Sequence, residues 1–168
     1  MPAVEQIQAD EVEVRRAPGI QVTRTSGMVP EAINAAMASA FHELGSFMAR
    51  HPVTPIGPPR AVYTGYAAGT TFNVVFPIAA AAGVVTDPEG AVTVAELPGG
   101  RAWRFTHVGP YRNLSDTYAR ITEWLRERHL LETEADWATF MPMWEEYLDD
   151  PQTTPESELR TYIYLPRP

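Results

Sequence analysis

The stretch EVEVRRAPGIQVTRTSG, at residues 11–27, has a counterpart in VTVAELPGGRAWRFTHVG, at residues 92–109. Each copy holds an alternating run of apolar and polar residues, a Pro-Gly pair, a second alternating run and a closing glycine. Alternation with a period of two is typical of a β-strand with one buried face, and a Pro-Gly pair is typical of a turn. We therefore expect two strands joined by a turn at the start of each of two internal repeats.

A helical pattern follows each copy. Within residues 30–50, apolar side chains recur at spacings of three and four, at Ile33, Met37, Phe41, Leu44 and Met48. The same spacing occurs within residues 114–129, at Leu114, Tyr118, Ile121 and Leu125. This periodicity predicts one amphipathic helix in each repeat, with its apolar stripe turned toward a sheet.

Two further strands are predicted after each helix, from runs rich in aromatic and β-branched residues. They are residues 60–66 and 71–78 in the first repeat, and residues 140–148 and 159–166 in the second. The chain then forms one domain, residues 1–168, with a first repeat at about 7–86 and a second at about 87–168. We expect an α+β fold, in which two main helices cover one face of an antiparallel sheet and a ligand cavity lies between the halves.

The composition narrows the range of functions. The net charge is −8, and every one of the 13 Lys and Arg residues is arginine. The excess of acidic residues opposes binding to nucleic acid phosphates and mildly favours cationic ligands. The chain lacks cysteine, which excludes disulfides and thiolate metal sites and fits a reducing cytoplasm. No apolar run approaches the roughly 20 residues of a membrane span. We expect a cytoplasmic protein without a membrane-bound segment.

Sequence signatures of metal and cofactor sites are missing. The four histidines, His42, His51, His107 and His129, show no spacing typical of metal ligands. No phosphate-binding loop, dinucleotide fingerprint or Ser-His-Asp pattern occurs. We therefore predict neither a metal nor a cofactor. For His107 we expect bonds to nearby backbone, with proton transfer as the alternative.

The strand predicted at residues 140–148 carries two adjacent acids, in the run MWEEYLDDP at residues 143–151. Strand side chains alternate between faces, which groups Met143, Glu145 and Tyr147 on one face and Trp144, Glu146 and Leu148 on the other. Either acid could face a cavity, and a bulge in the strand would exchange the two assignments. The acid turned away from the cavity would need a sheet edge or an arginine beside it.

Four segments together resemble a known family. They are HVGPY at residues 107–111, WEEYLDDP at 144–151, Thr-Pro-Glu at 154–156 and LRTYIYLP at 159–166. The chain resembles the gyrase-inhibitor-like (GyrI-like) small-molecule-binding domain, which also occurs as the effector domain of multidrug-responsive transcription regulators. The resemblance covers nearly the whole chain. It is most specific in Glu-x-Tyr-Leu-x-Asp-Pro and the following Ile-Tyr-Leu-Pro, and looser in the first half.

The resemblance implies a tandem pair of strand–helix–strand–strand (SHS2) units, with an aromatic-lined cavity between them and a buried glutamate near its floor. Family members bind hydrophobic, often cationic compounds. Some stand-alone members resemble hydrolases that open the cyclopropane of DNA-alkylating natural products with that glutamate. The Glu-x-Tyr motif maps onto Glu145 and Tyr147, which become the candidate catalytic residues. The family places Tyr111 close to the ligand, and a hydrophobic staple at the helix entry is an equally good explanation for this residue.

Further aromatic residues are candidates for the cavity wall, although ordinary core packing would explain each of them as well. Trp103 and Phe105 share a strand face, and only one of Tyr63 and Tyr66 is expected to face the groove. The predicted ligand-binding residues are Glu145, Tyr147, Trp103, Phe105, Tyr66, Tyr111, Met143 and Phe72.

Three functions fit these observations. The first is a stand-alone, multidrug-like binding protein for hydrophobic or cationic small molecules. The second is a hydrolase of reactive cyclopropane-containing natural products, with Glu145 as general base. The third is a protein-interaction module of the gyrase-inhibitor type. The sequence before Glu11 has no room for a helix-turn-helix, so we expect no direct DNA binding, and we expect a monomer or a weak dimer.

Overall fold

One antiparallel sheet organises the computed structural model, which describes residues 7–27, 29–51, 53–66, 70–79 and 91–167. The elements follow the chain in the order β1 (Asp10–Val14), β2 (Ala17–Ser26), α1 (Pro30–Arg50), β3 (Arg60–Tyr66), β4 (Thr70–Pro77), β5 (Thr93–Leu97), β6 (Gly100–Val108), the 3₁₀ turn η1 (Tyr111–Asn113), α2 (Leu114–Glu127), η2 (Glu134–Phe140), β7 (Met143–Tyr147), η3 (Glu156–Glu158) and β8 (Arg160–Pro166). The mixed α/β composition with an antiparallel sheet confirms the predicted fold class.

The order of strands in the sheet shows how the two repeats combine. The 8-stranded sheet has the order β1-β6-β8-β7-β3-β4-β2-β5. Corresponding strands of the two repeats occupy mirrored places in this order, and β3 and β7 meet at the centre. The first strand of each repeat pairs with the other repeat, because β1 pairs with β6 and β5 pairs with β2. The two halves are therefore interlocked, and the expected boundary between residues 86 and 87 lies outside the described residues.

The predicted turn at Pro18-Gly19 is wrong. Both residues lie inside β2, and the chain leaves the strand conformation at residues 15 and 16 instead. A Cβ atom at Gly19 would lie 2.6 Å from the Cγ1 atom of Val75 and 3.0 Å from the carbonyl oxygen of Phe76. The glycine thus permits close approach of two strands, whereas in the second copy the turn does lie at Pro98 and Gly99, between β5 and β6.

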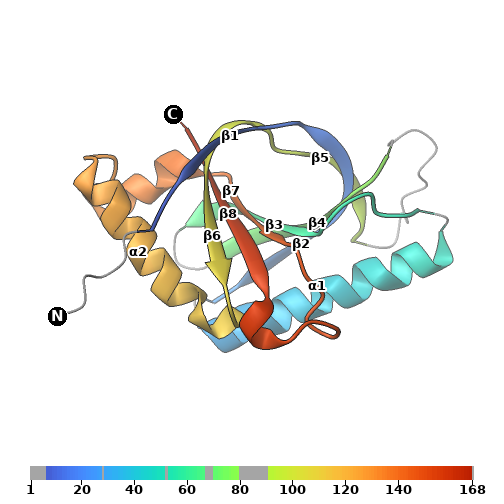
Figure 1. Ribbon diagram of the computed structural model, residues 1–168. Helices are drawn as coiled ribbons and strands as arrows, with labels where there is room; N and C mark the ends of the chain where they lie inside the picture. Colours follow the sequence, from blue (N-terminus) through green and yellow to red (C-terminus); the bar gives the residue numbers. More distant parts are fainter. Residues whose placement is uncertain (1–6, 28, 52, 67–69, 80–90, 168) are drawn as a thin grey trace.

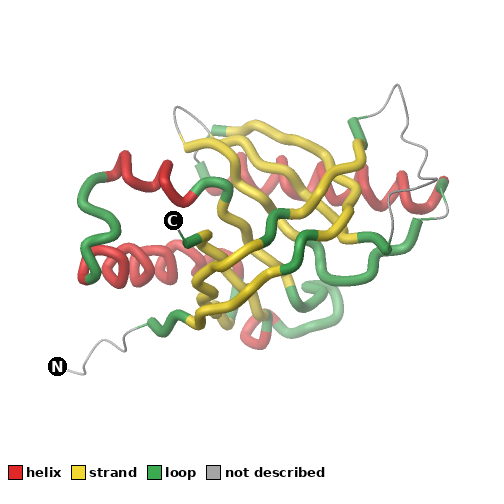
Figure 2. The backbone as a smooth tube through the Cα atoms, turned by 90° about the horizontal axis from the view of Figure 1, so that it is seen from above, coloured by secondary structure: helices red, strands yellow, loops and turns green. Residues whose placement is uncertain are grey.

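Both long helices pack on the same face of the sheet (Figure 1). Helix α1 has the predicted bounds and buries Leu44 and Phe47 against Ile20, Val22 and Phe72. Helix α2 ends at Glu127, two residues before the predicted end, and buries Ile121 and Leu125 against Phe105 and Ile163. Seen from above in Figure 2, the sheet lies across α1. None of the helices in the described part of the chain is long and apolar enough to cross a membrane.

Among the described residues, the other face of the sheet carries no helix, and the sheet curls so that β1 and β5 arch over it (Figure 1). Apolar side chains from both halves pack there, namely Val62, Val75, Leu97, Ala102, Trp144 and Tyr164. Burial on both faces explains why β7 contains a run of buried residues rather than an exposed alternation.

Candidate ligand-binding cavity

A cavity of about 1670 Å³ lies on the helix-bearing side of the sheet. One wall is the N-terminal half of α1, and the opposite wall is η1 with the start of α2. The central strands β3 and β7 supply the floor, and residues 148–152 after β7 border the opening. The cavity thus lies between the two repeats, at the place where the central strands meet.

Glu145 lies on the floor of this cavity, with only 3% of its surface exposed. The alternation of β7 turns it to the same side as Met143 and Tyr147, and all three line the cavity. Tyr63, which pairs with Met143 across β3 and β7, joins them. The structure therefore places the predicted residues Glu145, Tyr147 and Met143 together.

Three tyrosine hydroxyls donate hydrogen bonds to the Glu145 carboxylate. Its Oε1 atom accepts from Tyr147 at 2.9 Å and from Tyr63 at 3.2 Å. Its Oε2 atom accepts from Tyr118 of α2 at 2.9 Å. Residues from three elements of both repeats therefore hold one carboxylate in a fixed position.

Burial decides the protonation behaviour of these groups. Loss of solvent raises the pKa of the Glu145 carboxyl, and the hydrogen bonds from Tyr118, Tyr147 and Tyr63 counteract part of that rise. Burial also raises the pKa of all three phenols well above the usual range, and the neighbouring carboxylate adds to it. The tyrosines therefore remain donors at neutral pH, and Glu145 gains stabilisation from any cation that reaches it.

Glu146 points to the opposite face of the sheet. Its Oε2 atom accepts a hydrogen bond from the Arg60 Nε atom at 3.2 Å, and its Oε1 atom accepts one from the Tyr164 hydroxyl at 3.2 Å. The ring of Trp144 stacks on Tyr164 beside it, with centroids 5.2 Å apart. The predicted arginine beside the second acid is thus present. Leu148 departs from the prediction and lines the cavity, because β7 ends at Tyr147 and the alternation stops there.

An aromatic wall rises from the floor. Tyr147 packs edge-on against Tyr111 of η1, with ring centroids 5.5 Å apart, and against Phe41 of α1 at 6.4 Å. Phe41 in turn packs against Phe76 of β4 at 6.0 Å. The predicted residue Tyr111 lines the cavity and is half-buried. Burial raises its pKa, and Asp149, Asp150 and Glu145 raise it further.

Three predicted aromatic residues lie elsewhere, because α1 and α2 cover the sheet on either side of the cavity. Trp103 and Phe105 pack against Trp124 of α2, with centroids 5.4 Å and 5.3 Å away. Phe72 lies in the core beneath α1 and contacts Tyr63. These residues do not line the cavity. The side chain of Tyr66, the remaining prediction, lies outside the described part of the structure.

Sequence reasoning missed Tyr118 and Phe41 as cavity residues. Both belong to the apolar helical stripes that were assigned to core packing, and each stripe does face the sheet. The polar hydroxyl of Tyr118 within an otherwise apolar stripe was the one available signal, since a buried phenol needs a hydrogen-bond partner.

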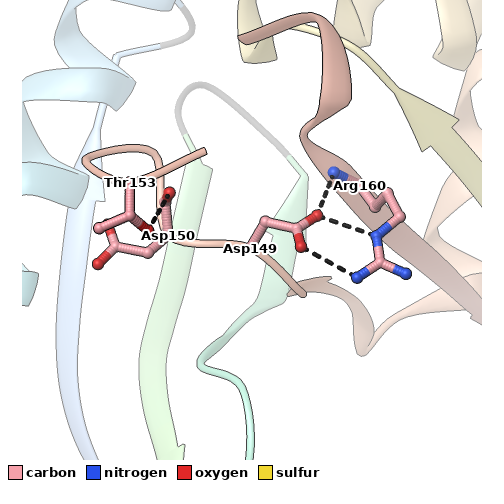
Figure 3. A network of polar contacts seen from close by, with 4 residues as sticks. All are labelled: Asp149, Asp150, Thr153 and Arg160. Atoms are coloured by element: carbon pink, nitrogen blue, oxygen red, sulfur yellow. Dashed lines mark hydrogen bonds and ion pairs between the residues drawn. The ribbon is translucent and has the colours of Figure 1, made fainter. Parts of the chain in front are cut away.

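The segment after β7 is anchored by Asp149, which pairs with Arg160 of β8 (Figure 3). Its two carboxylate oxygens bind the Arg160 guanidinium at 3.0 Å each, and Oδ2 also accepts the Arg160 backbone N–H at 2.9 Å. The Arg160 side chain and backbone lower the pKa of Asp149. Next along the chain, the Asp150 side chain accepts the N–H of Gln152 at 2.8 Å. These contacts order the rim of the cavity.

His107 is bonded on both ring nitrogens. Because a carbonyl can only accept, Nε2 donates to the Pro110 oxygen at 3.0 Å, and in the neutral imidazole Nδ1 accepts from the Thr117 hydroxyl at 2.6 Å. The bond to the Pro110 carbonyl agrees with the expectation that His107 bonds nearby backbone, and proton transfer was the alternative. Within the described residues, no group of three or more histidines and carboxylates is placed to hold a metal ion.

The sequence model of the GyrI-like small molecule binding domain matches residues 19–167. No curated protein matches the chain by sequence.

Solved structures share the fold at low sequence identity. The C-terminal domain of EcmrR is 17% identical, with a TM-score of 0.70, over 95% of this chain and 96% of that one. In an EcmrR–DNA complex the match has 16% identity and a TM-score of 0.75, and it covers 98% of this chain but 59% of the EcmrR chain. A hydrolase from Listeria innocua matches at 14% identity and a TM-score of 0.57, over 98% of this chain and 93% of that one. SAV2435 bound to tetraphenylphosphonium matches at 10% identity and a TM-score of 0.62, over 95% and 93%.

Proposed function

The chain belongs to the GyrI-like small molecule binding domain family, and we propose that its cavity binds hydrophobic organic cations with Glu145 as their counter-charge. The observation that carries the proposal is a carboxylate 3% exposed on the floor of an aromatic-lined cavity. Such a group has lost most of its hydration, and a cation within contact would replace it.

The wall of the cavity supports the same ligand class. Tyr147, Tyr111 and Phe41 contact one another and line the same cavity as Glu145. Each aromatic face that a cation contacts contributes about 0.5–2 kcal/mol, with the larger values for desolvated sites. A ligand with apolar groups around its charge would fill the remaining cavity surface. Tetraphenylphosphonium is such a cation, and SAV2435, which shares the fold, has been solved bound to it.

The hydrogen bonds of Glu145 favour binding over catalysis. Its Oε1 atom already accepts from two hydroxyls and its Oε2 atom from one, so a single acceptor position remains for a ligand or water. A general base must take a proton from water with a free lone pair, and the three donors counteract part of the basicity that burial gives the carboxylate. We therefore place Glu145 and Tyr147 in ligand binding, and hydrolysis of a reactive electrophile is the rival that the experiment must separate.

Isothermal titration calorimetry with tetraphenylphosphonium tests the proposal, and the neutral triphenylphosphine oxide serves as the matched ligand. We expect the wild-type protein to bind the cation and to bind the neutral compound more weakly. Glu145→Gln should weaken cation binding by at least about 2 kcal/mol, roughly 30-fold, because a buried counter-charge is lost. Glu146→Gln is the matched control, since this neighbour faces away from the cavity.

Three outcomes would contradict the proposal. Equal affinity for the cation and the neutral compound would remove the counter-charge argument. A loss of binding in Glu146→Gln but not in Glu145→Gln would mean that the other acid reaches the ligand. A water-added product detected by mass spectrometry with a cyclopropane-bearing alkylator, formed repeatedly by the wild type and absent with Glu145→Gln, would replace binding with hydrolysis.

A further inference from the structure

Negative charge in the cavity occurs at two depths. Glu145 is buried on the floor, whereas Glu31 of α1 and Asp150 line the cavity as exposed side chains. We call Glu31 and Asp150, the exposed carboxylates of the cavity lining, the rim carboxylates. In the part of the chain that the structure describes, neither forms an ion pair.

The other charged groups of the cavity wall are compensated by residues elsewhere. Asp149 is held by the Arg160 guanidinium, and Arg112 pairs with Glu156 at 2.9 Å. These two pairs contribute little net charge to the opening. The rim carboxylates therefore add a second, uncompensated negative region to the one at Glu145.

The size of the cavity leaves room to reach both regions. Its volume of about 1670 Å³ exceeds the roughly 300–1,000 Å³ of common ligand sites. Apolar and aromatic side chains, among them Met37, Phe41 and Tyr111, line the cavity beside polar ones such as Asn34 and Ser115. A compact ligand with one charge, seated at Glu145, would leave the outer part of the cavity unfilled.

We propose that the cavity takes elongated bis-cations, which place one cationic group at Glu145 and the second at the rim carboxylates Glu31 and Asp150. The apolar spacer of such a ligand would lie along the wall formed by Phe41 and Tyr111. The inference rests on the proposed function, because it takes the site at Glu145 as the first cation site. It adds a second site and a preference for ligands with two separated charges.

Decamethonium and decyltrimethylammonium form a matched pair of probes, because they share one alkyl chain and differ in the second cationic head group. Their affinities would be measured by calorimetry for the wild type, Glu145→Gln, Glu31→Gln and Asp150→Asn. The asparagine retains an oxygen that can accept the Gln152 N–H, so the rim backbone keeps its hydrogen bond. Glu123→Gln, an exposed carboxylate of α2 outside the cavity, controls for the overall charge of the protein.

We expect each rim substitution to weaken decamethonium binding by about two- to five-fold, the range of exposed ion pairs, and to leave decyltrimethylammonium nearly unchanged. Glu145→Gln should weaken both ligands, and Glu123→Gln neither. The rim effect should shrink at high salt, since exposed charges are screened more than buried ones.

Different results would overturn the two claims separately. Rim substitutions that weaken both ligands equally, or neither, would refute the second cation site while leaving the site at Glu145 intact. A result in which Glu145→Gln changes neither affinity would refute the cation site at Glu145 and the bis-cation site with it. If the wild type binds neither probe, the bis-cation site is refuted, and the titration with tetraphenylphosphonium decides separately whether single cations bind.

Discussion

The ion pair between Arg60 and Glu146 gives a quantitative test of how burial determines the contribution of an ion pair to the free energy of unfolding. The two residues face each other across β3 and β7, with Nε and Oε2 3.2 Å apart. Their side chains are 14% and 11% exposed. Replacing Arg60 with methionine would leave the Glu146 carboxylate among Trp144 and Val62, with only the Tyr164 hydroxyl as a described partner.

The expected cost follows from what remains after the substitution. Removing one partner of a buried pair costs about 3–5 kcal/mol, because the remaining charge stays desolvated. We expect Arg60→Met to fall near the lower end, at about 3 kcal/mol, since one Arg60 Nη1 atom is itself buried without a hydrogen-bond partner among the described residues. The double variant Arg60→Met/Glu146→Leu should recover most of this loss, because apolar side chains replace both charges inside an apolar cluster.

Urea denaturation, followed by circular dichroism and tryptophan fluorescence, measures these free energies of unfolding. The matched control is the pair of Arg16 and Glu96, which has the same 3.2 Å separation but side chains 71% and 62% exposed. Arg16→Met should cost less than about 1 kcal/mol. If Arg60→Met costs no more than Arg16→Met, burial does not set the worth of this pair. If the double variant is as unstable as Arg60→Met, the unpaired carboxylate is not the cause of the loss.

Further outcomes can be measured on the same protein. Cation affinity should fall as the pH is lowered through the raised pKa of Glu145, because the protonated carboxyl offers no counter-charge, and a calorimetric pH series that stays flat would contradict this. Gly19→Ala should lower the free energy of unfolding by about 1–3 kcal/mol, because the added methyl group would overpack the space between two strands. Gly45→Ala, in open space on α1, should raise it by up to about 1 kcal/mol. If urea denaturation ranks the two variants in the opposite order, the close approach of the strands at Gly19 does not explain the glycine. Phe105→Leu should lower the melting temperature and leave ligand affinity unchanged, because Phe105 packs under α2 outside the cavity. Tyr111→Leu should weaken cation binding by about two- to thirty-fold. A loss of affinity in Phe105→Leu would mean that this residue does contact the ligand.

Local patterns predicted most of the elements. The stripe within residues 30–50 predicted α1 with its bounds, and the runs at 60–66 and 159–166 predicted β3 and β8 to within a residue. Alternation in residues 143–147 grouped Glu145 with Tyr147, and the structure keeps that grouping. These predictions depend on the period of side-chain directions along one element, which the sequence contains in full.

Contacts between elements distant in the sequence could not be predicted from local patterns. The exchange of β1 and β5 between repeats has no local signature, because it depends on which edges become available after both halves form. A Pro-Gly pair lies within a strand at Pro18-Gly19 and in a turn at Pro98-Gly99, and the two residues alone do not distinguish these cases. What distinguishes Gly19 is the close approach of β4, which depends on the tertiary structure.

The sequence by itself determined most of the helices and strands, the repeat and the pair of acids at Glu145 and Glu146, because these follow from residue type and spacing. Tertiary structure alone decided which aromatic residues line the cavity. Trp103, Phe105, Phe41 and Tyr111 are all large aromatic residues; the first two lie on β6, and the last two on α1 and η1. The first two are covered by α2, and the last two border the space between the helices, so the placement of the helices on the sheet makes the difference. That placement results from packing summed over many contacts, and no single residue encodes it.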